Sequence, residues 1–169
     1  MTDTLLGPAL VEEATKKSGL IWVRGDAPTA RALWHVWHEG AAHVVGDGPG
    51  EQPLPGLVAG STAEVTVRSK DKGGRIVAWT AAVSELAPGT EAWDAAVAEL
   101  KGKRLNATDG EAMPERWARE CRVLRLEPLD STTDLPDGSL AAVPQRSDAV
   151  TRRPAPAGLP RLLFKRRKR

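Results

Sequence analysis

The sequence predicts a mainly β protein: a small closed or half-open antiparallel barrel with one amphipathic helix, followed by a disordered tail. Two segments, residues 30–46 and 61–86, are rich in Val, Trp and Ala and are each interrupted by a glycine turn, as β-hairpins are. One run with helical spacing, residues 90–104, comes late in the chain. This order of elements favours a barrel with the helix covering one opening.

The first elements are a short helix and a strand. Pro8 suits the first turn of a helix over residues 8–17, because its missing N–H costs nothing there. Gly19 is placed to end that helix. Residues 18–24, which read SGLIWVR, are dense in apolar and β-branched side chains and predict a strand.

The first hairpin joins strands over residues 30–39 and 41–46 through a turn at Glu39 and Gly40, where glycine can take a positive φ. Alternation along the first of these strands divides its side chains between two faces. One face carries Leu33, His35 and Trp37, and the other Trp34, Val36 and His38. Both faces are largely apolar, so we expect barrel core on one side and a ligand or a second subunit on the other.

After a Gly/Pro-rich loop, residues 61–72 and 75–86 predict a second antiparallel hairpin. The helix over residues 90–104 has Thr90 as its N-cap, with acidic residues near its start and basic residues near its end. A short helix over residues 114–119 and a strand over residues 120–129 complete a domain of six strands.

Composition changes sharply at residue 130. Residues 1–129 hold 15 Lys/Arg against 18 Asp/Glu, whereas residues 130–169 hold 9 against 4. The later segment is rich in Pro, Ser and Asp and cannot bury enough surface to offset its ordering entropy, which predicts a disordered, Pro-rich, basic tail. Its last nine residues, RLLFKRRKR, could contact polyanions weakly and without sequence preference.

Several classes of function lack support. We see no signal peptide and no apolar run long enough to span a bilayer, and Cys121 is the only cysteine, so we expect a cytoplasmic protein. His35 and His38 lie on opposite faces of one predicted strand, so no metal site is predicted. No Ser or Cys has a recognisable base partner, and we predict no catalytic side chain.

Residues 18–24, 30–45 and 61–86, with the Gly-rich loop between the last two, resemble the FMN-binding split barrel of the pyridoxamine 5′-phosphate oxidase-like superfamily. The resemblance covers roughly residues 18–129, includes the aromatic hairpin with its Glu-Gly turn, and is nearest to actinobacterial members. It implies a six-stranded split barrel, a homodimer, and FMN in a groove at the subunit interface.

The resemblance also implies site residues. Along the flavin it places Arg31, Trp34, His35, Val36 and Trp37, with Gly46 bordering it. The loop after residue 46, GDGPGEQPLPGL, has Gln52 near the position of the family's basic phosphate ligand. Glu51 beside it is acidic and would repel a phosphate. Arg68, Ser69 and Lys70 could supply the phosphate contacts instead.

Two functions therefore stay open. One is a flavin-dependent oxidoreductase or flavin carrier, in which deazaflavin F420 or haem could replace FMN. The other is an interaction module that has lost FMN and whose groove is filled by its own tryptophans. The histidines and tryptophans of the hairpin fit either a ligand site or a packed core.

Overall fold

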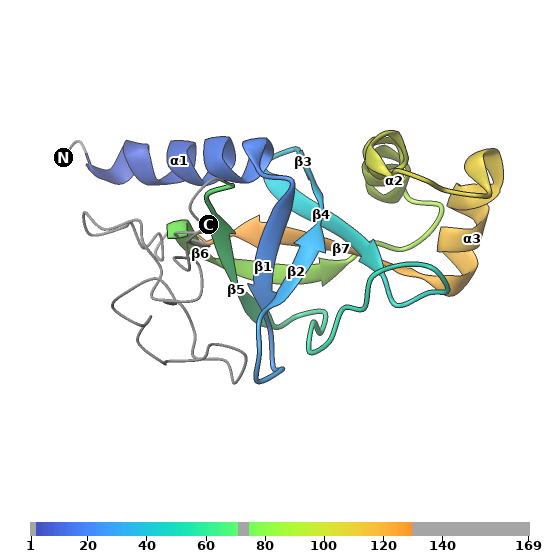
Figure 1. Cartoon of the computed structure of the whole chain (residues 1–169), viewed down its shortest axis with the longest axis horizontal. Helices are drawn as coiled ribbons and strands as arrows, with labels where there is room; N and C mark the ends of the chain where they lie inside the picture. Colours follow the sequence, from blue (N-terminus) through green and yellow to red (C-terminus); the bar gives the residue numbers. More distant parts are fainter. Residues whose placement is uncertain (1–2, 71–74, 130–169) are drawn as a thin grey trace, which may run out of the picture.

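The computed structural model describes residues 3–70 and 75–129. These residues form three α-helices, one 3₁₀ turn and seven strands (Figure 1). Their bounds are α1 (Asp3–Lys17), β1 (Leu20–Arg24), β2 (Arg31–Trp34), β3 (Val36–His38), β4 (Ala41–Gly46), β5 (Thr62–Arg68), β6 (Arg75–Glu85), α2 (Glu91–Lys103), η1 (Gly110–Ala112), α3 (Met113–Glu120) and β7 (Arg122–Pro128). The predicted tail, and with it the domain boundary at residue 129, lies outside the described residues.

All strands belong to one antiparallel sheet with the order β2-β1-β5-β6-β7-β4-β3. The two edge strands, β2 and β3, follow one another in the sequence and are separated only by His35. A single residue cannot bridge the two edges of a flat sheet, so the sheet curls until its edges nearly meet. The predicted antiparallel barrel is confirmed.

The number of strands differs from the predicted six. The segment expected as one strand over residues 30–39 breaks at His35, because its two halves pair with different neighbours. Trp34 lies opposite Leu20 of β1, whereas Val36 lies opposite His43 of β4. The break is the corner at which the barrel passes from one edge to the other, and it gives seven strands.

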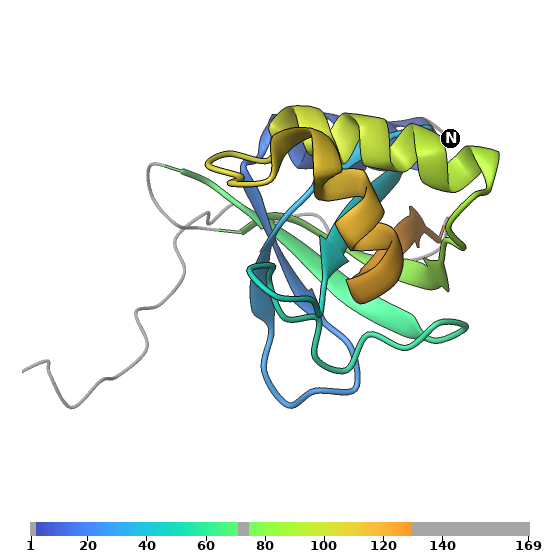
Figure 2. The same cartoon turned by 90° about the vertical axis from the view of Figure 1, so that its right-hand side faces the viewer.

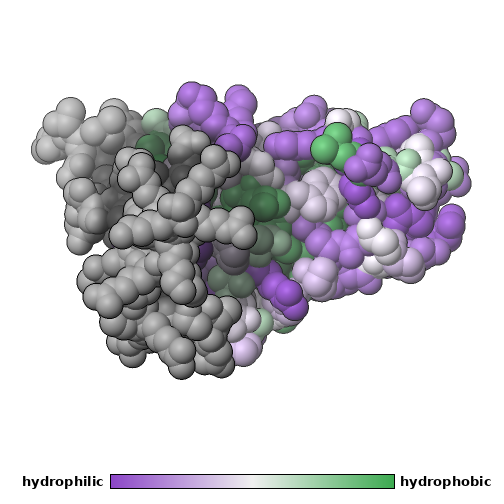
Figure 3. All heavy atoms as spheres, in the orientation of Figure 1, coloured by the Kyte–Doolittle hydropathy of each residue, from purple (hydrophilic) through white to green (hydrophobic). Residues whose placement is uncertain are grey.

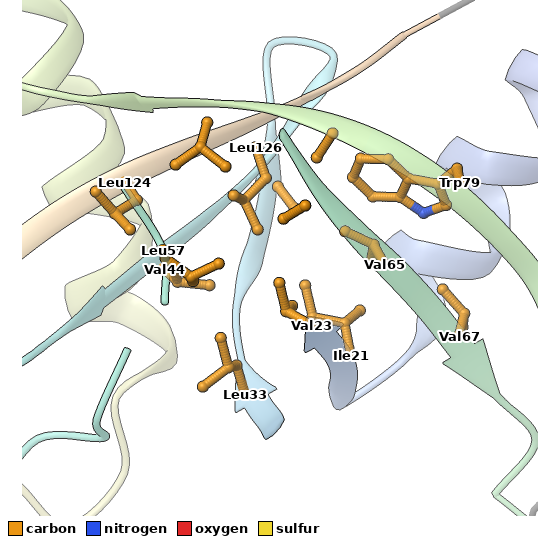
Figure 4. Close-up of a cluster of buried hydrophobic side chains, with 14 of the residues drawn as sticks. Ile21, Val23, Leu33, Val44, Leu57, Val65, Val67, Trp79, Leu124 and Leu126 are labelled. Carbon is orange, nitrogen blue, oxygen red and sulfur yellow. The ribbon is translucent and has the colours of Figure 1, made fainter. Parts of the chain in front are cut away.

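The barrel interior is filled by aliphatic side chains from nearly every strand (Figure 4). Ile21, Val65 and Leu126 are each 0% exposed and point toward this common centre from three different strands. Trp79 of β6 is the largest side chain in the cluster. Leu33 and Trp37, which alternation placed on one face of the strand, both pack with this cluster.

A second hydrophobic cluster lies outside the barrel and joins β3, β4 and β7 to α2 and α3. Figure 2 shows this helix pair packed beside the sheet. The predicted amphipathic helix is confirmed as α2, and it buries Trp93, Val97 and Leu100. Thr90 caps it by accepting a hydrogen bond from the Trp93 amide. Among the described residues, no helix is long and apolar enough to cross a membrane.

Candidate functional site

The structure distributes the predicted flavin-contacting segment between the two clusters. The ring of Trp37 packs edge-on against Trp79 inside the barrel, with centroids 6.3 Å apart. The ring of Trp34 is tilted against Trp117 of α3, with centroids 6.5 Å apart. Val36 is buried in the same outer cluster. At Trp34 and Val36, the chain's own helices supply the cover that was expected from a ligand or a second subunit.

His35 occupies the corner between β2 and β3 and is 0% exposed. Its Nε2 lies 2.8 Å from the carbonyl oxygen of Thr15, which ties the corner to α1. Burial lowers the pKa of His35 to about 4, with a smaller contribution from Lys103, so the ring is neutral at pH 7. No His, Cys, Asp and Glu side chains within residues 3–70 and 75–129 cluster in a way that could hold a metal ion.

Gln52 and Gly46 are neighbours in a small backbone bridge at the end of β4. The Gln52 amide donates to the carbonyl oxygens of Trp34 and Val45 and accepts from the Trp34 amide, at 2.9 to 3.2 Å. Both N–H groups of that side chain are therefore engaged with backbone, and a phosphate would have to displace them. The close approach explains the glycine at position 46, where an added Cβ would lie 2.2 Å from the Gln52 carbonyl oxygen.

The sequence suggested that Glu51 lies beside the phosphate of a ligand, but the structure buries its side chain. Its carboxylate is 0% exposed and accepts hydrogen bonds from Arg104, Arg116 and the indole Nε1 of Trp117. The two guanidinium groups compensate its charge, so the expected repulsion of a phosphate by Glu51 does not arise. Asp109 and then Glu51 raise the pKa of Arg116 above its ordinary value.

Sequence reasoning missed Arg104 and Arg116. They follow Glu51 by 53 and 65 residues, so no local spacing connects them to the loop. The only signal in the sequence was an acidic residue in a Gly-rich loop, and that signal does not identify a partner.

The structure does bring together three of the predicted phosphate ligands. Arg68, Ser69 and Lys70 line a groove of about 310 Å³ between α1 and the end of β5, which we name the α1–β5 groove. Apolar side chains form much of it, and Lys17 with Glu13 lies on the α1 side. The apolar lining residues are Leu10, Ala14, Val67 and Ile76. Three cationic side chains and one carboxylate therefore border an apolar floor, an arrangement suited to an amphipathic anion.

Arg68 connects this groove to the outer face of β1. Its guanidinium carbon lies 4.4 Å from the ring centroid of Trp22, which makes a cation–π contact. Leu20, two residues before Trp22 and on the same face, is 51% exposed. Arg31 is exposed on the neighbouring strand β2. Figure 3 shows hydrophobic side chains gathered over the strands in the middle of one face, beside mostly hydrophilic helices.

Comparisons with known proteins bear on the fold. No protein-family model and no curated protein matches the chain. Among solved structures, the heme storage protein HutZ from Vibrio cholerae matches with a TM-score of 0.53 and 14% identity, over 74% of this chain and 91% of HutZ.

A protein from Listeria innocua, provisionally described as a pyridoxamine 5′-phosphate oxidase, matches with a TM-score of 0.50 and 12% identity. The match covers 76% of this chain and 96% of that one. At such identities the likeness establishes the fold alone. The chain therefore has the expected split-barrel fold, and HutZ and the Listeria innocua protein share that fold.

Proposed function

We propose that this protein binds a planar, phosphate-bearing cofactor of the flavin class, with FMN as the first candidate, and works as a flavin-dependent oxidoreductase or flavin carrier. The observation that carries the proposal is the α1–β5 groove, in which Arg68, Ser69 and Lys70 meet Lys17 beside an apolar floor. Of the two solved structures with this fold, HutZ is named as a heme storage protein and the Listeria innocua protein as a pyridoxamine 5′-phosphate oxidase. The cytoplasm remains the proposed location.

The residues present fit the phosphate end of such a cofactor. Arg68 and Lys70 offer charged donors and Ser69 offers a hydroxyl, and charge-assisted hydrogen bonds of this kind are about twice as strong as neutral ones. Trp22, held beside Arg68, offers an aromatic face to a planar ring. When bound, the flavin would supply the redox chemistry, and the chain would bind it, orient it and limit its contact with water.

A second copy of the chain would complete this site. The outer face of β1 and β2 exposes Leu20 to 51% and leaves Trp22 half-buried, and a partner's surface could cover both. We therefore keep the homodimer as part of the proposal. Arg31 on β2 would then lie at the boundary between the two copies.

The test is a titration of the full-length protein with FMN, followed by quenching of flavin and tryptophan fluorescence. Replacing both Arg68 and Lys70 by Ala should weaken FMN binding at least about tenfold, because each lost charge-assisted hydrogen bond is worth roughly 1.5–3 kcal/mol. The charge-matched control replaces Lys101 and Arg119, on α2 and α3, by Ala and should leave the affinity unchanged. Equal affinities for the two double variants would overturn the assignment of the phosphate site.

The packing of the tryptophans favours a second candidate, an interaction module without flavin. Trp34 and Trp37 are packed against the chain's own Trp117 and Trp79 rather than left to face a ligand. If the protein is such a module, we expect the purified protein to be colourless and its tryptophan fluorescence to stay unchanged when FMN is added. F420 and haem, tested in parallel by absorbance, distinguish a different cofactor from none.

A further inference from the structure

The buried carboxylate of Glu51 has more partners than a surface ion pair does. Its Oε1 accepts from Arg116 Nη2 and from Trp117 Nε1, both at 3.0 Å. Its Oε2 accepts from Arg104 Nε at 3.1 Å. The carboxylate is 0% exposed, and the two arginine side chains are only 25% and 21% exposed. Both oxygens are thus enclosed by donors that come from the end of α2 and from α3.

These donors are held in place by other groups. Arg104 also donates to the carbonyl oxygens of Gly50 and Leu105. Arg116 also donates to Asp109 and to the carbonyl oxygen of Pro49. Because each guanidinium has partners other than Glu51, its orientation does not depend on Glu51 alone. Two fixed guanidinium groups and an indole N–H around one point are the donor set that recognises an oxyanion.

We propose that Arg104, Arg116 and the Trp117 indole N–H form an oxyanion receptor that the chain fills with its own Glu51 carboxylate. The ligand class is a carboxylate or a phosphate monoester, since both present oxygens in a geometry that paired guanidinium groups bind. This receptor is separate from the α1–β5 groove and does not depend on flavin binding there.

The loop that carries Glu51 presents the carboxylate rigidly. The Asp47 amide donates to the Gln52 carbonyl oxygen at 2.9 Å, and the Leu54 amide donates to the Asp47 carboxylate at 2.7 Å. An internal group held in this way has an effective concentration that dissolved anions at about millimolar levels do not match. The native protein therefore keeps the receptor filled, and added anions do not enter it.

An external anion also has a path to the receptor. A pocket of about 420 Å³ opens beside it, between the loop that carries Glu51 and the segment that follows α2. Its polar lining consists of Asn106, Thr108, Arg104, Arg116 and the Asp109 that pairs with Arg116. Removal of the Glu51 side chain would join the pocket to the space that the carboxylate occupies.

Glu51→Ala in the full-length protein tests the proposal. Its melting temperature is measured by circular dichroism in chloride, formate and phosphate at equal ionic strength and pH. An anion present at ten times its Kd should raise the Tm by roughly 4 °C over chloride, because a bound ligand stabilises the folded state. A response to formate identifies a carboxylate site, and a response to phosphate alone identifies a phosphate site.

Two controls separate the receptor from general salt effects. Wild type and Glu85→Ala, which removes a half-exposed carboxylate from Arg122, should melt at the same temperature in formate and chloride. Any rise in phosphate that all variants share through the α1–β5 groove is subtracted from that of Glu51→Ala. The proposal is overturned if the Glu51→Ala protein melts at one temperature in all three, or if the controls respond equally.

A second pair of variants serves if Glu51→Ala does not fold. Glu51→Asp keeps a carboxylate near the receptor, and Glu51→Asn is its neutral match in size. The Asp variant should melt several degrees higher, because the two guanidinium groups require a negative charge and not merely a hydrogen-bond acceptor. Equal melting temperatures for the two would overturn the proposal.

Discussion

Acidification from pH 7 to pH 5 should destabilise this protein through two buried histidines. Burial lowers the pKa values of His35 and His43 to about 4, whereas an imidazole in the unfolded chain titrates near 6.5. For His43 the positive charge of Arg125 contributes in the same direction, after burial. Between pH 6.5 and 4 the unfolded state therefore binds more protons than the folded state does.

Proton binding to the unfolded state sets the direction of this pH effect. The contribution of each histidine to stability is complete above pH 6.5 and is lost as the pH falls toward 4. For these two pKa values, the loss between pH 7 and pH 5 is about 2 kcal/mol per histidine. Most carboxylates titrate below this interval, so the histidines dominate it. Two such losses are a large share of the free energy of unfolding of a typical domain, which is roughly 5–15 kcal/mol.

Urea unfolding at several pH values measures this effect. His35→Gln keeps an N–H donor for the Thr15 carbonyl but does not titrate, so it should remove about half of the pH dependence. His43→Gln should remove the other half, and the double variant should be nearly flat from pH 7 to pH 5. If the His35→Gln protein loses as much stability as the wild type over this interval, the assignment of a neutral buried ring is wrong.

Further predictions concern the packing and the surface. Gly48→Ala should lower the free energy of unfolding in urea by about 1–3 kcal/mol, because its Cβ would lie 2.3 Å from the Cys121 sulfur. The control Gly19→Ala has open space around its Cβ and should leave the stability unchanged. Equal losses for the two variants would contradict the steric argument. Thr90→Ala should cost about 1 kcal/mol through loss of the α2 cap, and an unchanged urea midpoint would count against that cap. The Cys121 thiol, whose pKa burial raises, should react slowly with a disulfide reagent at pH 7 in the native state and quickly in urea. Leu20→Asp should shift any dimer to monomer in light scattering, and a persistent dimer would place the interface elsewhere.

The candidate site was only partly predictable. Arg68, Ser69 and Lys70 are adjacent in the sequence and at the end of a strand, so their common position on one groove needed little tertiary information. The role of Glu51 could not be foreseen, because its partners come from residues 104 to 117 and only the folded chain brings them to the loop. An isolated acidic residue in a loop therefore looked like an unfavourable neighbour of a phosphate.

Local signals in the sequence were enough for the β5–β6 hairpin, for the spacing and cap of α2, and for the common face of Leu33 and Trp37. The break at His35 could be seen only in the folded chain, since the strand divides where its halves form opposite edges of the sheet, one paired with β1 and the other with β4. The tertiary structure also decided that α2 and α3 cover Val36. Alternation shows that a face is apolar, but what buries that face depends on segments distant in sequence.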